Sequence, residues 1–232
     1  MYLLSLQSSK MMGLKVIITG ATGMVGEGVM LECIANDYIK EILLIVRKPS
    51  GVAHPKVKEI VHSNFFDIGP IAGQLKGYDA CYFCLGVSSI GMKEPEFHKM
   101  SYELTRHCAD VMAAQNTGMV FCYVSGAGTD STEKGKTMWA RVKGKIENYL
   151  LQHSQLKGFM FRPGYMHPTP GAKNTLKGYK YITWMYPLLK HLMPNSTSTL
   201  ADLGRAMIAV TVKGSDNKIL EVKDIKMLSK EL

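Results

Sequence analysis

Three glycines at intervals of three residues, Gly20, Gly23 and Gly26, form the pattern in this chain best suited to chemistry. A β-branched run stands directly before them and an apolar helical pattern directly after them. At such a turn one glycine makes the tight passage from strand to helix, one lets the backbone approach a pyrophosphate, and one lets the helix lie close to the sheet. Amide groups at the helix start would face the phosphates, where the helix dipole adds favourable charge. The pattern predicts a dinucleotide phosphate site made by the loop residues Gly20, Thr22, Gly23, Met24, Val25 and Gly26.

The alternative interpretation of this loop is a glycine-rich turn in an ordinary α/β protein. A side chain at Gly20 or Gly23 would block the path of the pyrophosphate or force unfavourable dihedral angles. We therefore expect substitution of either glycine to abolish cofactor binding while leaving the fold largely intact.

The residues after the second predicted strand indicate which dinucleotide is bound. In NAD-binding proteins a carboxylate at this point bonds the adenosine ribose, whereas arginine accommodates the 2′-phosphate of NADP. Here the apolar run ends at Val46 and continues into Arg47 and Lys48, with no acidic residue. Because a guanidinium binds phosphate oxygens bidentately, this turn favours NADP(H) over NAD. A solvated basic turn is the alternative.

Two later positions are suited to complete such a site. Asp67 follows a polar turn at the place where folds of this kind often hold a carboxylate near the adenine. Leu85 and Gly86 end an apolar strand beside the expected cofactor, and the glycine permits a close approach. We expect all three residues to contact the cofactor.

The elements that must position these residues alternate along the chain. Strand-like runs stand at 15–19, 41–46, 57–61, 80–85, 119–124 and 159–161, and helical runs at 24–35, 96–115, 134–153 and 201–212. This alternation predicts an α/β fold, a doubly wound parallel sheet of the Rossmann type that binds ligands at its carboxyl edge. We expect 13–232 to form a single NAD(P)-binding domain to which 165–232 contributes a small C-terminal substrate lobe. Residues 1–12 are expected to be a frayed leader.

The order of these motifs resembles the short-chain dehydrogenase/reductase superfamily over nearly the whole chain from about Lys15. The residues that carry the resemblance are Gly20–Gly26, Arg47, Asp67, Leu85, Gly86, Ser125, Lys143, Arg162, Pro163 and Gly164. The segment 217–222 also looks like the closing strand of extended and atypical members. Among these members the chain looks closest to the atypical, Tat-interacting-protein-like oxidoreductases and their bacterial relatives. The resemblance implies cofactor contacts from Lys143, Arg162, Pro163 and Gly164, and a Ser125 that orients a carbonyl.

The chain departs from this superfamily at the usual acid. The family pattern is Tyr-x-x-x-Lys on one helix, where the lysine lowers the pKa of the tyrosine. Here Trp139 stands four residues before Lys143, and an indole N–H does not titrate usefully. Lys143 as a solvent-facing helix lysine and Ser125 as a turn residue are the alternatives to catalytic roles.

The proton source is therefore open. Tyr165 is the first candidate for the acid, ahead of His167, Tyr102 and His98, and for each of them a packing role is the alternative. Four aromatic residues would form an apolar roof over a substrate, or else an interface or membrane-surface patch: Tyr179, Tyr181, Trp184 and Tyr186.

Composition restricts the classes of protein to which the chain can belong. Of its 232 residues 46% are hydrophobic and 20% charged, which is typical of a globular protein, and no apolar run reaches the ~20 residues of a membrane-spanning helix. The net charge of +9 is spread along the chain, so we expect no nucleic-acid partner. Five cysteines form no paired framework, and Cys81 and Cys84 share one predicted strand. We therefore expect no metal and a cytoplasmic location.

The leading functional hypothesis is NADP-dependent oxidoreduction of an unknown small molecule. The alternative from another class is a non-catalytic NADP(H)-binding module that senses redox state or regulates a partner. Binding of nucleic acid or a membrane surface through net charge is a weaker third hypothesis. The oligomeric state stays open, with a homodimer as one option.

Overall fold

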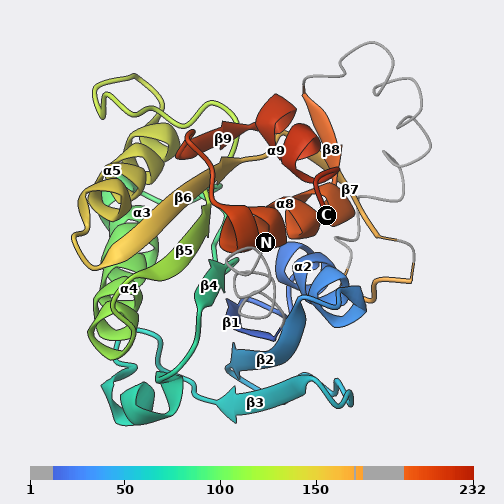
Figure 1. Cartoon of the computed structure of the whole chain (residues 1–232). Coiled ribbons are helices and arrows are strands. Elements are labelled where there is room, and N and C mark those ends of the chain that lie inside the picture. The colour runs from blue at the N-terminus through green and yellow to red at the C-terminus, as the bar shows by residue number, and fades with distance from the viewer. Residues whose placement is uncertain (1–12, 170, 175–195) are drawn as a thin grey trace.

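The computed structural model describes residues 13–169, 171–174 and 196–232 (Figure 1). The predicted leader at 1–12 and the aromatic roof at 179–186 lie outside the described residues. Within the described part, no helix is both long enough and apolar enough to cross a membrane.

One parallel sheet of seven strands organises the chain, in the order β3-β2-β1-β4-β5-β6-β9. The strands are β1 (Leu14–Thr19), β2 (Ile39–Val46), β3 (Val57–Val61), β4 (Ala80–Phe83), β5 (Met119–Val124), β6 (Leu156–Arg162) and β9 (Ile219–Glu221). The order runs outward in both directions from the β1–β4 pair, so the crevice at their carboxyl ends is a topological switch point. The predicted doubly wound α/β fold is confirmed.

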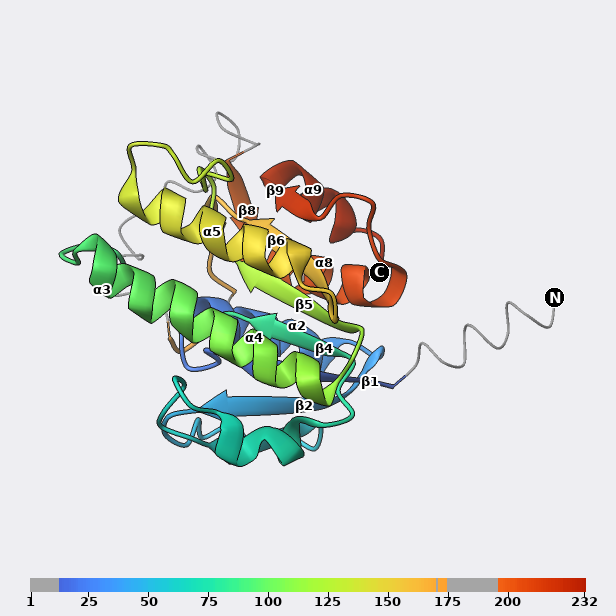
Figure 2. The ribbon, with the colours of Figure 1, turned by 90° about the vertical axis from the view of Figure 1, so that its left-hand side faces the viewer.

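Helices cover both faces of this sheet. On one face lie α2 (Met24–Ala35) and α8 (Leu200–Lys213), and on the other lie α4 (Leu104–Gln115) and α5 (Met138–Gln152) (Figure 1). Figure 2 shows α4 and α5 side by side, in agreement with their contacts. Short helical pieces complete the chain: the 3-10 turn Gly69–Leu75, α3 (Glu94–His98), the π-helical segment Lys99–Glu103 and α9 (Val222–Leu228).

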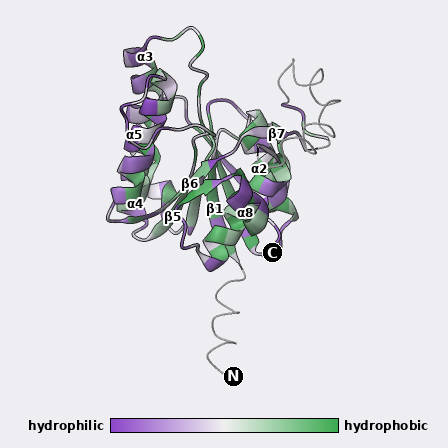
Figure 3. Ribbon diagram, turned by 90° about the horizontal axis from the view of Figure 1, so that it is seen from above, coloured by the Kyte–Doolittle hydropathy of each residue, from purple (hydrophilic) through white to green (hydrophobic). Residues whose placement is uncertain are grey.

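The central strands are apolar throughout because both of their faces are buried. Val16 and Ile18 point into the core beneath α2 and α8, and Ile17 between them points into the core beneath α4 and α5. Figure 3 shows the result from above, with hydrophobic strands between helices that turn hydrophilic residues outward.

Several predicted boundaries differ from the observed ones. The helix predicted at 134–153 begins only at Met138, because the Asp130 carboxylate organises the residues before it into a turn. Asp130 accepts hydrogen bonds from Gly135 N (2.6 Å) and Thr132 N (3.0 Å), and these bonds lower the pKa of its carboxyl group. β4 ends two residues earlier than predicted, and the helical run predicted at 96–115 is divided by the π-helical segment.

The chain from Tyr165 onward adds one strand to the main sheet and forms a second, smaller sheet. β9 pairs with β6 and forms the closing strand that the sequence predicted near 217–222. A separate two-stranded parallel sheet is formed by β7 (Tyr165–His167) and β8 (Thr197–Thr199), and it lies on the α2 side of the main sheet (Figure 3).

Candidate dinucleotide-binding site

The three glycines of the turn have different steric reasons for being glycine. Gly20 has a φ of +72°, and a Cβ there would lie 2.7 Å from the carbonyl oxygen of Cys84 at the end of β4. A Cβ at Gly26 would lie 2.2 Å from the oxygen of Gly20. Both positions therefore need glycine for the fold itself, which corrects the expectation that Gly20 can be substituted without structural cost.

Gly23 is different because the protein leaves room beside it. A Cβ at Gly23 would come no closer than 3.4 Å to its nearest neighbour, the oxygen of Gly20, and its φ of −102° suits any residue. The same residue is the N-cap of α2, and no side chain of the described residues caps this helix. The open space beside Gly23 and the uncapped first amides of α2 together fit a pyrophosphate.

A buried carboxylate supports the start of this helix. Glu27, in the first turn of α2, is only 6% exposed and accepts hydrogen bonds from the backbone amides of Lys173 (2.8 Å) and Asn174 (2.7 Å). Glu27 thereby fastens a segment far along the chain beside the glycine turn. Sequence reasoning missed this residue, and the only local signal was an acidic residue in the first turn of the helix.

A small cavity of about 130 Å³ lies at the ends of β2 and β4 and brings three predicted residues together. One of them, Leu85, adjoins the glycine turn, because a Cβ at Gly20 would lie 2.8 Å from Leu85 N. Arg47 from the end of β2 lines it with Leu85 and Gly86 from the end of β4. The other lining residues were not predicted: Ser63, Asn64, Phe65, Phe66, Val87, Met100 and Leu104. Residues 63–66 and Val87 follow β3 and β4, so the rule that parallel strands end at one edge could have found them. Met100 and Leu104 come from the helical run after α3, for which the sequence offered no such signal.

The structure places Asp67 and Lys48 away from the lining of this cavity. Asp67 Oδ1 accepts a hydrogen bond from Gly69 N (3.1 Å), so its carboxylate stabilises the turn before the 3-10 helix. Lys48 is exposed on the loop after β2. Arg47 is exposed too, and within the described residues it makes no hydrogen bond or ion pair.

Lys143 lies at the same edge of the sheet, between the ends of β4 and β5. Its Nζ donates to the carbonyl oxygen of Val124 (3.2 Å), lies 5.0 Å from the centre of the Tyr123 ring, and is 4.0 Å from where a Cβ of Gly86 would be. Burial lowers the pKa of Lys143 to about 8, against the opposing effect of the Glu147 carboxylate. Lys143 is therefore not a solvent-facing helix lysine.

Trp139 lies one turn before this lysine on α5, and Ser125 follows the residue whose carbonyl the lysine contacts. Val124, which accepts from Lys143, directly precedes Ser125. The Ser125 hydroxyl donates to the oxygen of Phe161 (3.0 Å), so its proton is committed to the neighbouring strand. The Trp139 ring packs by Gly128, where a Cβ would lie 3.7 Å from Cη2.

Arg162, which the resemblance assigns to the cofactor, makes structural contacts. Its Nε donates to Glu147 (3.0 Å), its Nη1 to Glu221 (3.2 Å) and its Nη2 to the Ser131 hydroxyl (2.5 Å). Glu147 is fully buried, and its carboxylate raises the pKa of the guanidinium. These bonds join β6 to α5 and β9, and they do not bring Arg162 to the glycine turn.

The residues after Arg162 also connect loops. Pro163 accepts a hydrogen bond from Ala127 N (2.9 Å), and a Cβ at Gly164 would lie 2.2 Å from the oxygen of Ser196. Tyr165 begins β7, on the opposite side of the sheet from α5 (Figure 3), and burial raises the pKa of its phenol. Cofactor contacts from these residues stay a prediction.

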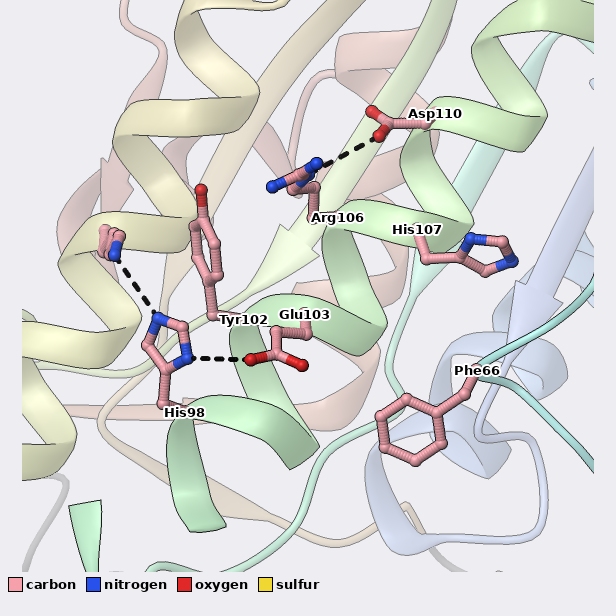
Figure 4. A pocket seen from close by; sticks show the side chains of 8 residues that line it. Phe66, His98, Tyr102, Glu103, Arg106, His107 and Asp110 are labelled. Carbon is pink, nitrogen blue, oxygen red and sulfur yellow. Dashed lines mark hydrogen bonds and ion pairs between the residues drawn. The ribbon is translucent and has the colours of Figure 1, made fainter. Parts of the chain in front are cut away.

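A larger cavity of about 590 Å³ opens on the outer side of α4 (Figure 4). Two of the lesser candidates for the acid, His98 and Tyr102, line it, but none of the predicted cofactor-binding residues does. Its polar side chains pair with one another: Lys145 with His98 (3.3 Å), His98 with Glu103 (3.4 Å) and Arg106 with Asp110 (3.7 Å). Phe66 lines both cavities, and the π-helical segment separates them.

The cysteines offer neither a metal site nor a thiolate in the described part of the chain. No group of three or more His, Cys, Asp or Glu side chains there could hold a metal ion. All five cysteines are free, Cys81 is fully buried, and burial raises the pKa of Cys84 to about 12.

The glycine turn at the switch point, with the cavity and the lysine beside it, defines the chain as a dinucleotide-binding Rossmann protein. A family model described as NAD(P)H-binding matches residues 20–180, more than half of the chain, and the chain belongs to this family. The prediction of an atypical short-chain dehydrogenase/reductase in the NAD(P)-binding Rossmann superfamily is thereby confirmed at the level of family and fold. The likeness to Tat-interacting-protein-like members stays a prediction.

Solved structures share the fold at low sequence identity. A dTDP-glucose 4,6-dehydratase from Streptomyces venezuelae, solved with NAD, is 16% identical at a TM-score of 0.67, over 90% of this chain and 75% of that one. The Bordetella bronchiseptica enzyme WbmF, in complex with NAD+, is 12% identical at a TM-score of 0.66, over 96% and 79%. Uronate dehydrogenase from Agrobacterium tumefaciens is 16% identical at 0.60, over 85% and 71%. A search of curated proteins found no match.

Proposed function

We propose that this NAD(P)H-binding protein takes NADP(H) and catalyses oxidoreduction of a small carbonyl-bearing molecule. The observation that carries the proposal is the shared edge at which the open position beside Gly23, the Arg47 cavity and Lys143 meet. NADP is preferred over NAD because Arg47 has no partner among the described residues and is free to bind a 2′-phosphate. The solved relatives whose descriptions name NAD leave this choice to be tested.

Each part of the edge has a proposed task. The amides from Gly23 onward hold the pyrophosphate, the cavity beside Leu85 holds the adenine, and Lys143 holds the nicotinamide ribose. When bound, the cofactor supplies the hydride. Ser125 orients the reacting oxygen, for which its hydroxyl must turn away from Phe161. The β7–β8 sheet and its neighbours in 165–232 serve as the substrate lobe of a single domain spanning 13–232.

A second candidate function is a non-catalytic NADP(H) sensor, and one observation favours it. Trp139 stands where the superfamily has its acid, and the one phenol seen beside Lys143 in the described part of the chain, that of Tyr123, is buried in the core and only 1% exposed. Such a module would bind the dinucleotide and report its redox state to a partner.

One experiment separates these functions. Fluorescence titration would measure the affinity for NADPH and NADH. The loss of NADPH absorbance at 340 nm would measure reduction of 4-nitrobenzaldehyde and 9,10-phenanthrenequinone. Tight NADPH binding with turnover supports the oxidoreductase. Tight binding with no turnover of either probe supports the sensor, and the absence of NADPH binding overturns both.

Two coarser expectations follow from the same proposal. Five free cysteines suit a reducing compartment, so we place the protein in the cytoplasm. A homodimer stays a prediction, which sedimentation of the purified protein would test.

A further inference from the structure

The proposed reduction needs a proton at the carbonyl oxygen, and the usual phenol is missing. The Trp139 indole carries an N–H that does not titrate, and the Ser125 hydroxyl already gives its proton to Phe161. Tyr165 belongs to β7, which lies across the sheet from α5 (Figure 3). Three titratable groups lie at the ends of β4 and β5. The Tyr123 phenol is buried in the core, and burial raises the pKa of the Cys84 thiol to about 12. The amine of Lys143 is the third, and it is only partly buried.

We propose that Lys143 itself delivers the proton in this protein, in place of the missing tyrosine. The inference rests on the proposed function. In the reducing direction the carbonyl carbon takes the hydride of bound NAD(P)H, and the oxygen takes a proton from Nζ. The carbonyl π bond and one N–H bond break as a C–H and an O–H bond form. The neutral amine then regains a proton from water, and alcohol oxidation follows the reverse course.

The geometry leaves Lys143 able to do this. Val124 O accepts one of the three ammonium protons, and this bond holds Nζ one residue from Ser125 and beside Gly86. The side chain is half-buried rather than enclosed, so the other two protons can meet a ligand at the edge of the sheet.

The surroundings of Lys143 also make proton release easier than for an ordinary lysine. Burial lowers its pKa to about 8, near the value at which a general acid works best around neutral pH. The charged and titratable groups that face it are Tyr123 from β5, whose ring lies beneath it, and Glu147 from α5, whose charge raises the pKa. Arg162 from β6 holds that carboxylate. Below pH ~8 the ammonium is present, and above it the acid is lost.

The first test reads the proton directly and needs no turnover. Protein labelled with ¹³C at lysine Cε would be titrated by NMR, alone and with NADPH, and the Lys143 signal assigned from the Lys143→Arg variant. We expect a midpoint near pH 8. A midpoint at the ordinary lysine value of about 10.4 in both states would overturn the proposal.

The second test separates charge from proton transfer. Arginine keeps the positive charge but does not deprotonate, so Lys143→Arg should keep NADPH affinity within a few-fold and lose about 10²- to 10⁴-fold in turnover. Lys145→Arg, a matched lysine two residues along α5, should change neither quantity. Adding Trp139→Tyr to Lys143→Arg supplies a phenol and should restore part of the turnover.

The outcomes of these tests distinguish the role of Lys143 from the oxidoreductase function on which it rests. Full turnover in Lys143→Arg would overturn the role of Lys143 and leave the oxidoreductase standing. A wild type that binds NADPH and reduces neither 4-nitrobenzaldehyde nor 9,10-phenanthrenequinone would overturn the oxidoreductase and this role with it. If Lys143→Arg fails to fold, kcat/KM of the wild type, which should fall as pH rises through about 8, carries the test; a flat profile from pH 6.5 to 9.5 overturns the proposal.

Discussion

At the scale of single residues, Gly23 is the glycine of the turn beside which the fold leaves room for a ligand. Gly23→Val should keep the thermal midpoint within a few degrees, because a Cβ there meets nothing closer than 3.4 Å, and should abolish NADPH binding. Circular dichroism and fluorescence titration would measure the two effects. Gly26→Ala is the contrasting control, since its Cβ would lie 2.2 Å from Gly20 O and the fold itself should fail. Undiminished affinity in Gly23→Val would make the loop only a turn.

The second prediction at this scale concerns Arg47 and the preference for NADPH. Arg47→Ala should weaken NADPH binding by about 1.5–3 kcal/mol, typical of hydrogen bonds to a charged group, and should leave NADH binding nearly unchanged. The physical reason is that only NADPH carries the 2′-phosphate that the guanidinium would bind. Paired titrations with both cofactors measure this, with Lys48→Ala as the neighbouring control. Equal affinity of the wild type for NADPH and NADH would contradict the assignment.

At the scale of elements, the Arg162 contacts hold β6, α5 and β9 together. Removing one partner of a buried ion pair leaves the other charge unpaired, so Arg162→Met should cost about 3–5 kcal/mol of unfolding free energy. Adding Glu147→Leu removes the stranded carboxylate and should recover much of the loss. Urea unfolding of both variants would measure this. If the double variant is stable yet binds NADPH poorly, the cofactor role that the resemblance assigns to Arg162 is correct after all.

At the scale of the whole molecule, Lys143 links stability to pH. Its folded pKa, about 8, lies below the unfolded value of about 10.4, so between these values the unfolded chain binds more protons and Lys143 costs less stability as pH rises. Lys143→Met should therefore raise the unfolding free energy at pH 7, on the order of 2 kcal/mol, and by less at pH 9.5. Urea unfolding at both pH values measures the difference. A difference independent of pH would mean that the lysine titrates normally in the fold.

Local and periodic features of the sequence sufficed for the fold class and the cofactor family. The glycine spacing, the apolar strands and their alternation with helices depend on near neighbours, which a single chain displays directly. Lys143 stands four residues after Trp139, and helix geometry puts residues at this spacing on one face. The structure places the lysine beside Gly86.

Only the tertiary structure decided which residues meet. Arg162 and Glu221 lie 59 residues apart in sequence, and Glu27 and Lys173 lie 146 apart, yet each pair shares a hydrogen bond. The different needs of Gly20 and Gly23 also depend on Cys84 at the end of another strand. Hydrogen bonds, clashes and desolvation depend on distances across the sheet, whereas motif spacing records only the order along the chain. For that reason the sequence determined a Rossmann dinucleotide-binding protein, and the packing decided which of its charged side chains stabilise the fold and which remain available to a ligand.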